Sequence, residues 1–113
     1  MGRTLLVVDD AVIIREMIKD AAMEAGWTIV GEADNGEAGI ERFKELRPDA
    51  VTLDLVMPEF DGRHALRGIL AVDPGAKVII VSALDQKDVL KQTFQQGASD
   101  FLVKPFDKQI LVE

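Results

Sequence analysis

Five short apolar runs, each of a length suited to a β-strand, alternate along the chain with longer segments of helical periodicity. The runs are Leu5–Val8, Thr28–Ala33, Val51–Leu53, Val78–Val81 and Phe101–Val103. Strands that are apolar on both faces, with a helix between successive strands, are typical of a parallel sheet covered on both sides. The sequence therefore predicts an α/β fold with a doubly wound, five-stranded parallel sheet and right-handed crossovers.

The segments between the runs carry helix start and stop signals. The first ends at Gly26, and the second begins after a capping Asn35. A fifth helix begins near Asp107 and has only about one and a half turns before the last residue. We expect a single domain over residues 1–113 with an incomplete C-terminal helix. In the first helix we expect Arg15 on the solvent face, with these residues facing the sheet: Ile14, Met17, Ile18, Ala21, Ala22 and Ala25.

The charge balance excludes two classes of partner. Lys and Arg number 13 and Asp and Glu number 20, so the formal net charge is −7. Nucleic acids and anionic lipids both require a basic face, so we expect neither partner. The chain has no cysteine, which excludes thiolate metal ligands and disulfides and suits a reducing cytosol. Its longest apolar runs are too short to cross a membrane.

Polar residues follow the apolar runs at the point where each strand should end. Asp9 and Asp10 follow the first strand, and Asp54 follows the third. Ser82 and Lys104 end the fourth and fifth. Because the carboxyl ends of parallel strands meet at one edge of a doubly wound sheet, these residues should form one pocket.

Three carboxylates in one pocket repel each other unless a cation is bound. Their hard oxygen atoms suit Mg²⁺, or Mn²⁺, better than zinc. With such a metal present, one carboxylate could attack phosphorus and form an aspartyl phosphate. The Lys104 ammonium and the Ser82 hydroxyl would then stabilise the phosphoryl oxygens.

Three segments in the expected order resemble the signatures of the receiver domains of two-component response regulators, of which single-domain chemotaxis regulators are the type. They are Val7–Asp10, Leu53–Gly62 and Phe101–Phe106. The resemblance covers nearly the whole chain. It implies a sheet of strand order 2-1-3-4-5 and a phosphorylation-activated signalling switch.

The resemblance also implies a role for individual residues. Asp54 matches the phosphoacceptor, Asp10 the direct Mg²⁺ ligand, and Asp9 its water-mediated neighbour. The backbone carbonyl of Val56 would complete the protein ligands.

Further matches concern the phosphoryl group and the response to it. Lys104 matches the phosphate-binding lysine, Ser82 the switch hydroxyl and Phe101 the aromatic residue that changes rotamer with it. The peptide bond between Lys104 and Pro105 is expected to be cis.

The resemblance implies partners on both sides of the switch. A sensor histidine kinase or a phosphotransfer protein would donate the phosphoryl group in the cytoplasm. An output protein, or a C-terminal effector domain, would respond through the face made by the fourth helix, fifth strand and fifth helix. The domain would catalyse only its own phosphorylation and slow dephosphorylation, so we do not expect an enzyme with a separate substrate.

Two residues at the predicted pocket rim bear on the lifetime of the phosphorylated state. Val56 and Leu84 each lie two residues beyond a site residue, at positions that vary among receiver domains. Both are apolar, so neither can orient an attacking water by hydrogen bonding. We expect a comparatively long-lived phosphorylated state.

Two alternative functions are weighed against this one. A phosphohydrolase of the haloacid-dehalogenase type would require Asp-x-Asp after the first strand, whereas Asp9 and Asp10 are adjacent and Ala11 follows. A flavodoxin-like electron carrier would require a hydroxyl- and glycine-rich phosphate loop there, and two aspartates would repel a phosphate.

Overall fold

The computed structural model describes residues 3–54, 62–83, 91, 95 and 97–104, with the backbone alone for 62–63, 82–83 and 100–104. Eight elements are assigned in this part of the chain. They are β1 (Thr4–Val8), α1 (Val12–Glu24), β2 (Thr28–Ala33), α2 (Gly36–Leu46), β3 (Ala50–Asp54), α3 (Gly62–Val72), β4 (Lys77–Ala83) and β5 (Asp100–Lys104).

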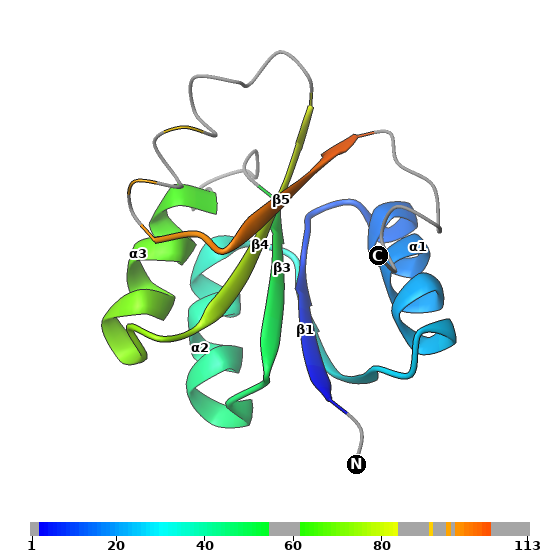
Figure 1. Cartoon of the computed structure of the whole chain (residues 1–113), viewed down its shortest axis with the longest axis horizontal. Helices are drawn as coiled ribbons and strands as arrows, with labels where there is room; N and C mark the ends of the chain where they lie inside the picture. Colours follow the sequence, from blue (N-terminus) through cyan, green and yellow to red (C-terminus); the bar gives the residue numbers. More distant parts are fainter. Residues whose placement is uncertain (1–2, 55–61, 84–90, 92–94, 96, 105–113) are drawn as a thin grey trace.

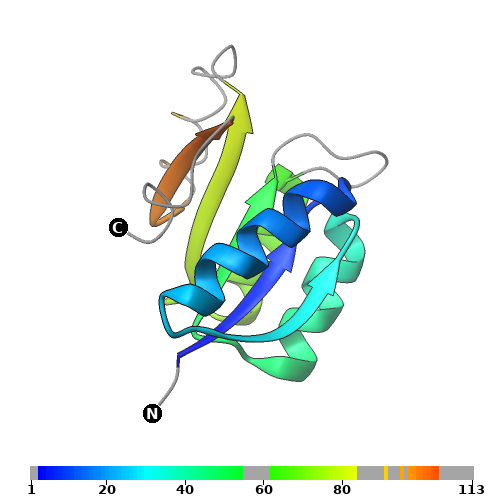
Figure 2. The same cartoon turned by 90° about the vertical axis from the view of Figure 1, so that its right-hand side faces the viewer.

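The five strands form one sheet of order β2-β1-β3-β4-β5, and every neighbouring pair is parallel. Helices α2 and α3 cover one face of the sheet, and α1 covers the other (Figure 1). Figure 2 shows the sheet from the side of α1, which crosses in front of the β1 strand. The doubly wound fold and the strand order predicted from the sequence are both confirmed.

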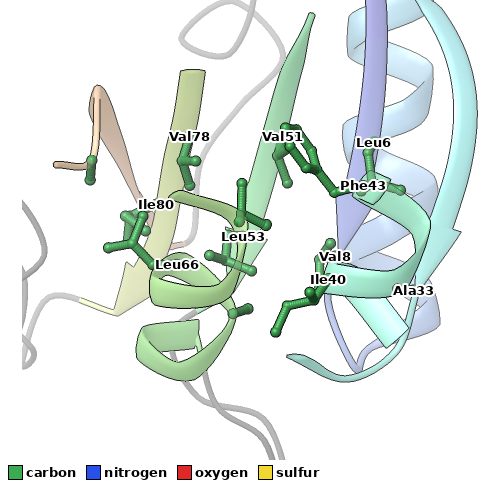
Figure 3. Close-up of a cluster of buried hydrophobic side chains, with 13 residues drawn as sticks. Leu6, Val8, Ala33, Ile40, Phe43, Val51, Leu53, Leu66, Val78 and Ile80 are labelled. Atoms are coloured by element: carbon green, nitrogen blue, oxygen red, sulfur yellow. The ribbon is translucent and has the colours of Figure 1, made fainter. Parts of the chain in front are cut away.

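Alternate residues of the central strands pack into two separate cores, because successive side chains of a strand point to opposite faces. Leu6 and Val8 of β1 pack toward α2 and α3, where Leu6 lies beside Phe43 and Val8 beside Ile40 (Figure 3). Leu5 and Val7 pack toward α1. Each large apolar side chain buried in this way contributes about 1.5–3 kcal/mol, which fixes the sheet against its helices.

The helix ends largely follow the predicted signals. Asn35 caps α2, because its side-chain Oδ1 accepts a hydrogen bond of 2.8 Å from the Ala38 amide. Gly26 follows the end of α1 with a φ of 94°, a conformation that glycine adopts without strain. The inward face expected for α1 was too wide, since Met17 is 39% exposed and Ala25 is also exposed.

Several sequence expectations fall outside the described residues. They concern the fourth and fifth helices, the positions of Val56 and Leu84, and the peptide bond before Pro105. Within the described part, no helix is long and apolar enough to cross a membrane.

Candidate functional site

Three carboxylates lie together at the carboxyl edge of the sheet. One oxygen from each of Asp9, Asp10 and Asp54 lies within 4.8 Å of the others. Asp9 is 1% exposed and Asp54 3% exposed, whereas Asp10 is open to solvent. The cluster, called the acidic pocket below, therefore consists of two buried acids and one acid exposed to solvent.

The register of the central strands brings these residues together. Val8 of β1 lies opposite Leu53 of β3, so the residues that follow them, Asp9 and Asp54, reach the same edge. Asp54 in turn lies opposite Val81 of β4. Apolar strands on both sides thus hold the two buried acids at the end of the sheet.

Hydrogen bonds fix the loop between β1 and α1. The amide of Asp9 donates to the Ala33 carbonyl at 3.0 Å, which ties the loop to β2. Its carboxylate Oδ1 accepts from the Ala11 amide at 2.9 Å. One side of the Asp9 carboxylate therefore supports the start of α1.

The donor set fits a hard divalent cation. Burial removes carboxylates from water, and mutual repulsion adds to that cost unless a positive charge is close. Carboxylate oxygens are the ligands that Mg²⁺ takes in proteins, often with several waters retained. The residues of the cluster could hold such an ion.

Two other predicted site residues, Ser82 and Lys104, reach the same edge through their backbones. Ser82 lies opposite Val103 in the pair of β4 and β5, and Lys104 is the last residue of β5. Phe101 lies opposite Ile80, further from the edge. The side chains of Ser82, Phe101 and Lys104 are outside the described part, as are Val56, Leu84 and Pro105.

Sequence reasoning missed one residue beside the pocket. Arg15, expected on the solvent face of α1, has a side chain only 15% exposed. Its Nη1 donates to the Asp9 carbonyl at 2.6 Å, and its Nε donates to Glu32 Oε1 at 2.9 Å. The only sequence signal was a cation five residues after two adjacent aspartates.

The comparisons with known proteins agree with this geometry. A family model described as "Response regulator receiver domain" matches residues 5–113. The chain belongs to this family. Among curated relatives, the chemotaxis protein CheY of Thermotoga maritima is 45% identical over all 113 residues and 94% of its own length. CheY of Bacillus subtilis is 43% identical, with the same coverage of both chains.

Solved structures give the same result. A chain of the CheX–CheY–BeF3–Mg²⁺ complex from Borrelia burgdorferi superposes with a TM-score of 0.93 and 33% identity. The match covers 97% of this chain and 84% of that one. The response regulator domain of Thermotoga maritima CheB gives a TM-score of 0.86, also at 33% identity, over 96% of this chain and 82% of that one.

Family membership decides between the functions considered above. The chain is a receiver domain similar to CheY, a phosphorylatable signalling switch and not a classical enzyme. The comparisons support neither the phosphohydrolase nor the electron carrier.

Proposed function

We propose that Asp54 is the phosphoacceptor of this domain and that Asp9, Asp10 and the Val56 carbonyl join it in holding Mg²⁺. The observation that carries the proposal is the cluster of three carboxylates, two of them buried, at the carboxyl edge of a receiver-domain sheet. Mn²⁺ has the same preference for oxygen ligands and could replace Mg²⁺.

The reaction transfers a phosphoryl group from a phosphohistidine. A carboxylate oxygen of Asp54 attacks phosphorus, so that an O–P bond forms as the P–N bond to the donor imidazole breaks. The imidazole nitrogen then takes up a proton. When bound, Mg²⁺ supplies positive charge to the phosphoryl oxygens. The Lys104 ammonium and the Ser82 hydroxyl donate hydrogen bonds to the same oxygens.

The response to phosphorylation follows from those contacts. Ser82 moves toward the phosphoryl group, and Phe101 changes rotamer with it. The peptide bond between Lys104 and Pro105 is expected to be cis. The altered surface is the face made by β5 and the fourth and fifth helices, which an output protein or an effector domain would bind.

We place the upstream partner among sensor histidine kinases and phosphotransfer proteins, and the reaction in the cytoplasm. The absence of cysteine from the sequence suits that location. The Borrelia burgdorferi relative occurs in a complex of CheX and CheY, which supports a separate output protein as one form of partner. Dephosphorylation by the domain itself would be slow.

The test is phosphorylation by acetyl phosphate in the presence of Mg²⁺, followed by mass spectrometry. Wild-type protein should gain one phosphoryl group, and Asp54→Asn should gain none. Asp49→Asn is the matched control, because Asp49 precedes the same strand at its opposite end. Undiminished labelling of Asp54→Asn would place the acceptor at another residue. Labelling that persists with excess chelator would show that phosphorylation does not require the metal.

A further inference from the structure

Arg15 connects the acidic pocket to β2, the outermost strand on one side of the sheet. It extends from the first turn of α1 and bonds two groups from other elements. One is the carbonyl of Asp9 in the loop after β1, and the other is the carboxylate of Glu32 on β2. Because the guanidinium is planar and rigid, bonds through Nη1 and Nε together fix its orientation.

Burial of the Arg15 side chain strengthens its bond to Asp9, whereas its bond to Glu32 lies at the surface. The Arg15 side chain is 15% exposed and that of Glu32 is 37% exposed. Glu32 also accepts from Lys19 at 2.9 Å, so its carboxylate is held from two sides. Hydrogen bonds that involve charged groups are shorter and about twice as strong as neutral ones, and the 2.6 Å bond to Asp9 fits that class.

The acceptor of that short bond, the Asp9 carbonyl, bears on the orientation of the peptide between Asp9 and Asp10. The carbonyl of Asp9 belongs to the planar peptide that joins Asp9 to Asp10. Fixing the carbonyl therefore fixes the plane from which the exposed Asp10 side chain extends. The Asp9 amide and carboxylate are already bonded to Ala33 and Ala11, so Arg15 holds the third polar group of the same residue.

We infer that Arg15 is a positioning residue for the metal site, which orients the Asp9–Asp10 peptide so that both carboxylates can share one divalent cation. This inference rests on the proposed function, in which that cluster binds Mg²⁺. Arg15 touches neither the cation nor the phosphoryl group, and it acts through the Asp9 backbone. Groups that orient metal ligands in this way typically change metal affinity 10- to 100-fold when they are removed.

Electrostatics alone predicts the opposite sign. Arg15 carries a positive charge close to a cation site, so its simple effect through space is to repel the metal. If that effect dominated, removal of the charge would tighten Mg²⁺ binding. If positioning dominates, removal of the side chain weakens binding. The direction of the change therefore separates the two roles.

The experiment measures the Mg²⁺ dissociation constant of the full chain by titration calorimetry. Arg15→Met removes the charge and the bonds, and Arg15→Lys keeps the charge but cannot form the planar two-sided contact. Both should raise the dissociation constant about tenfold or more. Equal or tighter binding by Arg15→Met would overturn the inference. A wild-type protein that binds no Mg²⁺ would contradict the proposed function instead.

Arg42→Met is the matched control. Arg42 lines the same open cavity of about 320 Å³ as Arg15 and Glu32, but its side chain is 51% exposed and pairs with Glu45 of its own helix at 3.4 Å. Its loss removes one positive charge from the same surface, whereas its ion pair lies within α2 and not with the pocket loop. Mg²⁺ affinity should stay within about twofold of wild type, and a loss as large as that of Arg15→Met would assign the effect to charge or to the cavity in general.

Two further measurements separate positioning from general damage. In the metal-free protein, amide exchange at Asp10 and Ala11 should be faster in Arg15→Met, while exchange in the centre of β3 stays unchanged. Labelling by acetyl phosphate should need more Mg²⁺ for half-saturation and reach a rate within about twofold of wild type at saturation. Should Arg15→Met fail to fold, Arg15→Lys and Glu32→Gln apply the same test, and unchanged half-saturation in both would overturn the inference.

Discussion

Removing one charge from the acidic pocket should stabilise the metal-free protein. Asp10→Asn is the suitable change, because Asp10 is the exposed member of the cluster and asparagine has the same size. The substitution removes the repulsion between Asp10 and two buried carboxylates, those of Asp9 and Asp54. It leaves the two buried side chains and their surroundings in place.

The size of the effect follows from the separation of the oxygens. Two unit charges 4.8 Å apart repel each other by about 0.9 kcal/mol in bulk water and about 3.5 kcal/mol at an effective dielectric constant of 20. The exposure of Asp10 and screening by salt keep each pair near the lower figure. Relief of two pairs then gives about 1–2 kcal/mol. For a chain of 113 residues this corresponds to a rise of about 4–8 °C in the melting temperature.

The assay is thermal unfolding followed by circular dichroism, with chelator and then with Mg²⁺. Asp10→Asn should melt higher than wild type in chelator and gain less from Mg²⁺, because a ligand has been lost. When the Mg²⁺ concentration is a hundred times the dissociation constant, binding stabilises the wild-type protein by about 2.7 kcal/mol. Asp20→Asn, at an exposed acid on α1, is the control and should change stability by less than about 0.5 kcal/mol. A melting temperature in chelator that falls or stays constant in Asp10→Asn would refute repulsion in the pocket.

Three further predictions concern other parts of the molecule. Trp27 lies next to Thr28, which pairs with the first residue of β1 at the edge opposite the pocket, so Mg²⁺ or beryllofluoride should change its fluorescence little; strong quenching by Mg²⁺ would contradict this placement. Val56→Asn and Leu84→Glu should speed the decay of phosphorylated protein, each tenfold change being about 1.4 kcal/mol of barrier, and equal decay of wild type and the double variant would exclude both side chains from control of the lifetime. Hydrogen bonds from the backbone amide and side chain of Thr4 lower the pKa of Asp49, so this stabilisation is present above the unfolded-state pKa near 4 and is lost as pH falls through the folded value. The melting temperatures of wild type and Asp49→Asn should therefore converge below about pH 4. A difference in melting temperature that does not change with pH would argue against it.

The sheet was predictable because its signal is local and repeated. Each strand of a buried parallel sheet must be apolar on both faces, and short runs such as Leu5–Val8, separated by segments of helical periodicity, have this pattern. Details set by packing were not predictable. Met17 has the spacing of the inward stripe of α1 but is 39% exposed. Arg47 adopts a left-handed φ of 45° after α2, which nothing in its residue type indicates.

The carboxylate cluster was predictable for a similar reason. A strand that changes from apolar to acidic at its carboxyl end places the acid at the edge where such sheets bind ligands, so Asp9, Asp10 and Asp54 could be grouped before any coordinates. Arg15 could not be added to them. The helical pattern assigns it to the polar face. Only the structure shows that Arg15 reaches the Asp9 carbonyl and Glu32 from that face.

The charges around Arg15 explain how a cation-binding pocket can have a guanidinium beside it. Arg15 and Lys19 both bond to Glu32, and Lys19 also bonds to Glu16 at 2.7 Å. Glu16 and Glu32 raise the pKa of Lys19, while the bond from Lys19 lowers the pKa of Glu32, so both groups remain charged near neutral pH. Two positive and two negative groups cancel formally. The network can therefore hold the Asp9 carbonyl while adding little net field to the pocket.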